Sequence, residues 1–145
     1  MWYNNFNYIL VYIWSDDAII AWFYHRIIIG ASAMIQVNQY IKTAFSAEDA
    51  ANLLKEIQPL VDAGEKIVLD FSEIKLFTTL FFNNALAKYV LEMGPEAYSH
   101  RFEVKNLSEV GETTYLHSME NAKDYYRVSA EEKEQQQKLL ADFDE

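Results

Sequence analysis

The sequence predicts an α/β domain built on a mixed, mainly parallel β-sheet with helices packed on it. Three segments with the pattern of β-strands, centred near residues 36, 68 and 104, alternate with segments of helical pattern. This alternation favours parallel strands joined by right-handed crossover connections. The chain of 145 residues is long enough to form one domain with a core of its own.

The first 33 residues differ in composition from the rest of the chain. All three tryptophans lie among them, at Trp2, Trp14 and Trp22. Two runs rich in β-branched and aromatic residues, 8–14 and 18–29, are separated by a Ser-Asp-Asp sequence, which predicts an additional N-terminal β-hairpin. Charged side chains interrupt the segment, so it fits neither a membrane span nor a secretory signal.

A second interpretation of this segment is that Met34 is the natural first residue and that residues 1–33 come from an upstream extension of the reading frame. On either interpretation the composition changes near residue 34. We therefore divide the chain into an aromatic-rich N-terminal extension or hairpin (1–33), a central domain (34–128) and an acidic C-terminal helix (129–145).

The first half of the central domain has clear strand and helix signals. Residues 35–41 alternate between apolar and polar side chains, which predicts a short strand. Ser46 and Asp49 have the spacing of a capping box and predict the start of a helix, which Gly64 ends. The continuous apolar run at residues 66–71 is typical of a buried central strand.

The second half continues the alternation. A helix is predicted over residues 79–93, followed by a strand over 102–107 and by two helices, 108–123 and 130–143. The helix at 79–93 has one broad apolar face, which we expect to pack against the strand at residues 67–69. That face includes Phe82, Leu86 and Tyr89.

Composition excludes several classes of function. The chain contains no cysteine, which removes disulfides, thiol catalysis and iron–sulfur clusters and fits a reducing, cytoplasmic compartment. A net charge of −10 argues against direct binding to nucleic acid. The three histidines have no metal-site spacing and the four glycines form no phosphate loop, so we expect no enzymatic activity, metal or cofactor.

The most informative stretch is residues 67–90. A buried strand ends at Asp70, a short loop follows, and Thr78 and Thr79 stand at the start of the next helix. Hydroxyl groups at that position cap free backbone N–H groups, and the helix dipole favours a negative charge beside them. Loops beyond the carboxyl end of a central strand are also where open α/β sheets usually carry their sites.

This stretch resembles the STAS-like domains of unknown function, which are related to the STAS domains of bacterial anti-sigma-factor antagonists. Residues 69–72, Leu-Asp-Phe-Ser, match the end of the family's apolar strand, and Ile74 matches the apolar residue that follows. Asn106 after the later strand and the Asn-Ala-x-x-Tyr-Tyr sequence at residues 121–126 are also similar. The resemblance covers about residues 35–128.

The resemblance implies a non-enzymatic regulatory module that binds a protein partner, either a kinase-like ATPase or another regulator, by partner switching. In the antagonists, the loop carries Asp-Ser-(Ser or Thr)-Gly, and its hydroxyl is phosphorylated. Alignment on Asp70 places that hydroxyl on Thr79, whereas Thr78 and Phe81 replace the Asp and the Gly. The implied partner-binding residues, with Thr79 as the candidate phosphosite, are Lys75, Phe77, Thr78, Thr79, Leu80, Asn83 and Asn84.

Two alternatives remain open at this point. An acidic inhibitor from a phage or bacterium would block a basic surface on a nucleic-acid enzyme, using the acids of the tail. Those acids are Glu131, Glu132, Glu134, Asp142, Asp144 and Glu145. The third alternative is a scaffold that forms a homodimer through the aromatic N-terminal segment.

Overall fold

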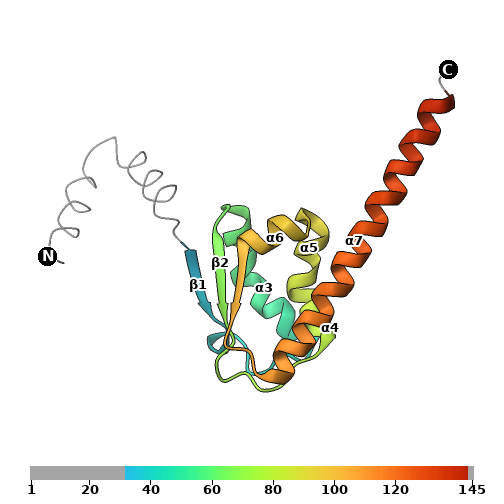
Figure 1. The fold of residues 1–145 in the computed structure, drawn as a ribbon. Helices are drawn as coiled ribbons and strands as arrows, with labels where there is room; N and C mark the ends of the chain where they lie inside the picture. Colours follow the sequence, from blue (N-terminus) through green and yellow to red (C-terminus); the bar gives the residue numbers. More distant parts are fainter. Residues whose placement is uncertain (1–31, 144–145) are drawn as a thin grey trace, which may run out of the picture. The chain divides into compact units, whose positions relative to one another are not determined.

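A computed structural model of the chain describes residues 32–143, with side chains through Leu139 (Figure 1). Internal contacts separate a unit Met1–Ser32 from a unit Ala33–Glu145, and the second unit contains the fold. The hairpin predicted over residues 8–29 lies outside the described residues.

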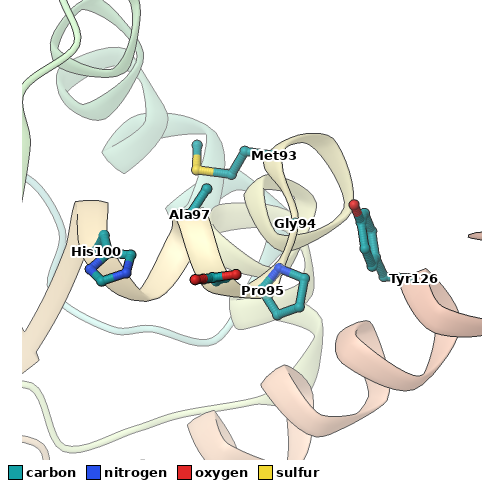
Figure 2. A pocket seen from close by; sticks show the side chains of 7 residues that line it. Met93, Gly94, Pro95, Ala97, His100 and Tyr126 are labelled. Atoms are coloured by element: carbon teal, nitrogen blue, oxygen red, sulfur yellow. The ribbon is translucent and has the colours of Figure 1, made fainter.

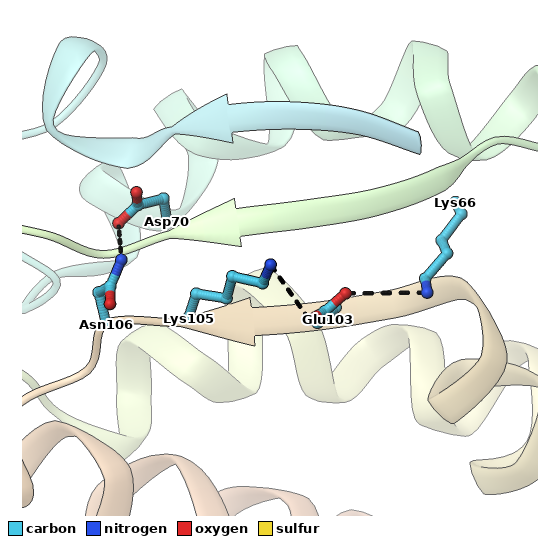
Figure 3. A network of polar contacts seen from close by, with 5 residues as sticks. All are labelled: Lys66, Asp70, Glu103, Lys105 and Asn106. Atoms are coloured by element: carbon cyan, nitrogen blue, oxygen red, sulfur yellow. Dashed lines mark hydrogen bonds and ion pairs between the residues drawn. The ribbon is translucent and has the colours of Figure 1, made fainter. Parts of the chain in front are cut away.

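The described fold is mixed α/β, as predicted, with a parallel sheet of three strands in the order β1-β2-β3 (Figures 1 and 3). These strands are β1 (Ser32–Gln36), β2 (Lys66–Asp70) and β3 (Phe102–Lys105). Strands β2 and β3 pair in parallel, with Ile67 opposite Phe102. The central, continuously apolar strand is β2, which confirms the prediction that this run is buried.

Helical segments connect these strands and continue beyond them. In chain order they are η1 (Val37–Gln39), α3 (Ala47–Asp62), α4 (Thr79–Phe82), η2 (Asn83–Ala87), α5 (Lys88–Met93), α6 (Pro95–Arg101) and α7 (Glu109–Phe143). Helix α3 begins with the predicted capping box, because Ser46 and Asp49 each accept a backbone hydrogen bond from the other. The predicted helix over residues 79–93 is helical throughout, but its middle, η2, is a π-helix.

Three elements differ from the prediction. Strand β1 ends at Gln36 rather than continuing to residue 41, because the chain curls at Val37, whose carbonyl accepts from the N–H groups of Tyr40 and Ile41. Helix α6 was not predicted: Gly94 ends α5 at a φ of 89°, and Pro95 then starts a new helix in the first-turn position that suits proline.

The third difference is α7, which is one helix of 35 residues rather than two. The predicted break lay between residues 123 and 130. Instead of capping a new helix there, the Ser129 hydroxyl donates to the Tyr126 carbonyl within the same helix. Gly111 lies in the first turn of α7, where it does not interrupt the helix.

The core lies between the sheet and the helices. Ile35, Ile67, Leu69 and Phe102 bring the inner face of the sheet into the main apolar cluster. Phe82, Leu86 and Tyr89 are fully buried there, which confirms the apolar face predicted for residues 79–93. Exposed polar side chains of β2 and β3 form ion pairs along the sheet, and these contribute little to stability (Figure 3). They join Lys66 to Glu103 at 3.7 Å and Lys105 to Glu103 at 3.4 Å.

Candidate functional site

Asp70 fastens the loop that follows β2. Its Oδ1 accepts hydrogen bonds from the Ser72 hydroxyl and from the Ser72 backbone N–H, the latter at 2.9 Å. It also accepts a hydrogen bond from the Asn106 side-chain amide at 3.0 Å (Figure 3). These bonds, those from Ser72 foremost, hold the pKa of Asp70 below its ordinary value. One carboxylate therefore ties the end of β2 both to its own loop and to the residue after β3. The Asp and Ser of the Leu-Asp-Phe-Ser sequence therefore hold the end of β2 to the loop that follows it.

The far end of the loop is fastened to the segment before α3. Ala44 and Phe77 form an isolated parallel bridge. The Ala44 N–H donates to the Leu76 carbonyl at 2.9 Å, and the Thr78 N–H donates to the Ala44 carbonyl at 3.0 Å. The Thr78 hydroxyl also donates to the Phe45 carbonyl. Residues that are more than thirty positions apart in the sequence are therefore neighbours at the start of α4.

The two threonines at this point have different environments. Thr78 is the N-cap of α4, since its Oγ1 accepts from the Phe81 N–H at 3.2 Å. Thr79 is the first residue of the helix, and its side chain is exposed. The hydroxyl that the resemblance marks as a phosphosite is therefore on the surface, and the cap is its neighbour.

Three large apolar side chains remain about half exposed around this helix start. They are Phe45 (50% exposed), Leu76 (48%) and Leu80 (53%). The backbone bonds described above bring the segment of Phe45 next to that of Leu76, and Leu80 lies in the first turn of α4. We call these three residues the apolar patch. Lys75 and Thr79 are exposed beside it.

Phe77 corrects the predicted set of contact residues. It is only 7% exposed and belongs to the core, where its ring stacks on Phe82 with centroids 6.0 Å apart. On another side it meets α7: a Cβ added to Gly111 would lie 2.8 Å from the Phe77 ring. Phe77 is therefore part of the core rather than of the exposed apolar patch.

The two predicted asparagines also differ from each other. Asn84 is exposed and its side-chain amide donates to the Leu80 carbonyl at 2.7 Å, so it lies beside the apolar patch. Asn83 accepts a hydrogen bond from the buried Ser118 hydroxyl of α7. The amide oxygen of Asn83 thus connects η2 to α7.

Phe45 is the exposed residue of the apolar patch that the sequence analysis does not single out. The Asp49 carboxylate fixes its backbone by accepting from the Phe45 N–H at 3.2 Å. Burial acts to raise the pKa of Asp49, but hydrogen bonds from Ser46, Thr43 and Phe45 together lower it. The local sequence indicates only that the Phe45 ring has little to pack on in its own helix, because a residue just before an N-cap often packs on the fourth helical residue, which here is the small Ala50.

A separate open concavity lies where α5, α6 and α7 meet, with a volume of about 520 Å³ (Figure 2). Met93, Pro95, Ala97 and His100 line it from α5 and α6, and Tyr126 lines it from α7. A side chain in place of Gly94 would be strained, because this residue has a φ of 89° and an added Cβ would lie 3.1 Å from the Tyr126 hydroxyl. None of the predicted contact residues lines this concavity.

Neither a metal cluster nor a membrane-spanning helix occurs in the part of the chain that the structure describes. Among residues 32–139, whose side chains are described, no group of three or more His, Asp or Glu side chains is arranged to hold a metal ion. Over the same range, no helix combines the length and the apolar character needed to cross a membrane.

The parallel sheet with its packed helices is a small mixed α/β domain, consistent with a STAS-like fold. Residues 49–112 match the family described as a STAS-like domain of unknown function. The match confirms the resemblance inferred from the sequence and includes the loop, α4 and the start of α7. No curated protein and no solved structure gives a significant match to the chain.

Proposed function

We propose that this protein is a non-enzymatic regulatory module that binds a protein partner, a kinase-like ATPase or another regulator, through the apolar patch. The single observation that carries the proposal is the exposure of Phe45, Leu76 and Leu80 around one helix start. Their backbone is held by the Ala44–Phe77 bridge.

Two features support the proposal that the apolar patch binds a partner. First, the patch has a fixed base, because Asp70 anchors one end of the loop and Thr78 anchors the other. A partner that binds it therefore loses less free energy to ordering the loop. Second, half-exposed leucine and phenylalanine side chains that gather at one place are typical of contact surfaces, whereas single exposed ones are ordinary.

Thr79 gives the patch a means of control. A phosphate on its exposed hydroxyl would add about −1.5 to −2 charges at pH 7 beside Leu80. The start of α4 tolerates negative charge, so the domain would stay folded. The partner, however, would meet a new charge at the edge of an apolar contact. Phosphorylation of Thr79 would therefore release the partner without unfolding this protein.

The test is an affinity capture from the native host that compares the wild-type chain with Leu80→Asp, followed by titration calorimetry on the captured protein. Leu91→Asp is the matched control, because Leu91 is 42% exposed on the same helical stretch but lies at its other end. We expect Leu80→Asp and Thr79→Glu to weaken binding at least tenfold, about 1.4 kcal/mol. Leu91→Asp and Thr79→Ala should bind almost as the wild type does.

A different result would favour the acidic-inhibitor alternative. If Leu80→Asp binds normally while neutralising Glu131, Glu132 and Glu134 abolishes binding, the proposal is wrong. In that case binding should also weaken steeply with salt, because it would depend on exposed charges.

A further inference from the structure

Two lysines border the apolar patch. Lys75 immediately precedes the first leucine of the patch, Lys42 lies three residues before its phenylalanine, and both lysines are exposed. The bridge between Ala44 and Phe77 is parallel. Two positions before these paired residues, the same register sets Lys42 opposite Lys75. Two positive charges therefore lie at one end of a group of half-exposed apolar side chains.

Neither lysine is neutralised within the part of the chain that the structure describes. The ion pairs found there involve other basic residues, namely Lys66, Lys105, Arg127 and Lys138. The acids nearest in sequence have other partners or none of these two. Glu73 accepts from the Asn38 side-chain amide at 3.3 Å, and Asp49 accepts from the N–H of the N-cap residue of α3. Like charges that lie opposite each other repel, so an anionic group between these lysines would be stabilised.

The charge at this end of the patch is opposite in sign to that of the whole protein. The chain has 12 basic and 22 acidic residues and a net charge of −10. Helix α3 carries Glu48 and Asp49 in its first turn, whereas α4 has no acid in its own. An acidic segment would be repelled by most of this protein and attracted where the two lysines lie. Such a difference determines where a charged partner docks.

We propose that the apolar patch recognises an acidic segment of its protein partner, in which Asp or Glu side chains stand beside apolar ones. The carboxylates would lie between Lys42 and Lys75, and the apolar side chains would cover the patch. This inference rests on the proposed function, since it concerns the same surface and adds the chemistry of the partner. It is opposite in sign to the acidic-inhibitor alternative, in which the partner is basic.

Selection from a library of random short peptides displayed on phage, with the full chain as bait, tests the inference. We expect the enriched peptides to combine Asp or Glu with Leu, Ile or Phe. The double variant Lys42→Glu/Lys75→Glu should not enrich them. The matched control is Lys123→Glu/Lys133→Glu, which changes the net charge equally at two exposed lysines of α7.

Fluorescence anisotropy with one labelled, enriched peptide measures the effect on affinity. Lys42→Glu/Lys75→Glu should raise the Kd by about tenfold or more, whereas the control should stay within about threefold of the wild type. Leu80→Asp should also raise it by about tenfold or more, because the peptide would lose its apolar contact. Circular dichroism checks that each variant remains folded.

The outcomes separate this inference from the proposed function. Enriched peptides that are neutral or basic, or that bind both double variants equally well, would overturn the inference. If Leu80→Asp still weakened their binding, the proposed function would stand without the lysines. If Leu80→Asp had no effect, both would be wrong. A library that yields no enriched peptide would overturn the inference, because a short acidic segment would then not be recognised.

Discussion

Residues 76–82 contain two sets of large apolar side chains in opposite environments. Phe77 and Phe82 stack on each other and are at most 7% exposed, whereas Leu76 and Leu80 are 48% and 53% exposed. All four are equally apolar in sequence. What separates them is α7, which covers Phe77 through Gly111 and leaves the leucines open. The comparison shows that the buried Phe77 and Phe82 contribute to stability, whereas the exposed Leu76 and Leu80 remain accessible to a partner.

The largest effect should come from the buried side of the same helical stretch. Leu86 is fully buried, so Leu86→Ala removes core contacts and leaves a cavity, and we expect it to lower the free energy of unfolding by about 2–5 kcal/mol. Leu91→Ala, at an exposed position, should change it by less than about 0.5 kcal/mol. Urea denaturation of both variants measures the difference. If both variants lost the same free energy of unfolding, the buried and exposed faces of this helical stretch would not differ in their contribution to stability.

Thr78 and Thr79 allow a second comparison of stability, at the start of α4. Thr78→Ala removes the cap of α4 and the bond to the Phe45 carbonyl, and should lower the free energy of unfolding by about 0.5–2 kcal/mol. Thr79→Ala removes only an exposed side chain and should stay within about 0.5 kcal/mol of the wild type. Thermal unfolding of the pair provides the measurement. A larger loss for Thr79→Ala would reverse the assignment of the cap.

The contribution of Asp70 to stability depends on pH, because its ionised carboxylate accepts the hydrogen bonds that hold the loop after β2. Its pKa is lowered from the ordinary 3.8 in the folded state, so its contribution to stability is fully present above that value. The contribution is lost as the pH falls through the lower pKa of the folded protein. We therefore expect wild type and Asp70→Asn to differ in stability at pH 6 and to converge in strong acid. A difference that stays constant down to the acid limit would contradict this.

The smallest effect on stability should come from the patch itself. Leu80 is more than half exposed, so Leu80→Asp should change the free energy of unfolding by no more than about 0.5 kcal/mol. Differential scanning calorimetry checks this in the absence of any partner. A loss comparable to that of Leu86→Ala would show that Leu80 belongs to the core, and its effect on binding would then have no independent meaning.

Local signals in the sequence predicted much of the fold. The capping box at Ser46 and Asp49 and the apolar run of β2 depend on neighbouring residues, and both were found where expected. Helix α6 was not predicted, because Gly94 and Pro95 are typical of a helix end, although a proline also suits the first turn of a new helix. The burial of Phe77, one of the implied partner-binding residues, has no local signal because Gly111, which lies against its ring, is more than thirty residues away in the sequence.

The candidate site was predictable in part for the same reason. The helix start, Thr79 and Leu80 follow from the strand–loop–helix order, and the structure places both side chains on the surface. Phe45 was missed because only the bridge between Ala44 and Phe77 brings its segment to that place. Pairing of this kind between distant segments has no local sequence signal.

Because α7 is one continuous helix, the direction in which each of its residues points is fixed relative to the first turn. Because the helix runs without a break from Glu109 to Phe143, each residue inserted after Ser129 would turn everything beyond it by about 100° and advance it by about 1.5 Å. An insertion of two residues would carry Leu139 to the far side of the axis, whereas an insertion of seven would return it almost to its original direction, about 10 Å further out. The direction of any segment that follows this helix therefore depends on the number of residues in the helix as well as on their identity.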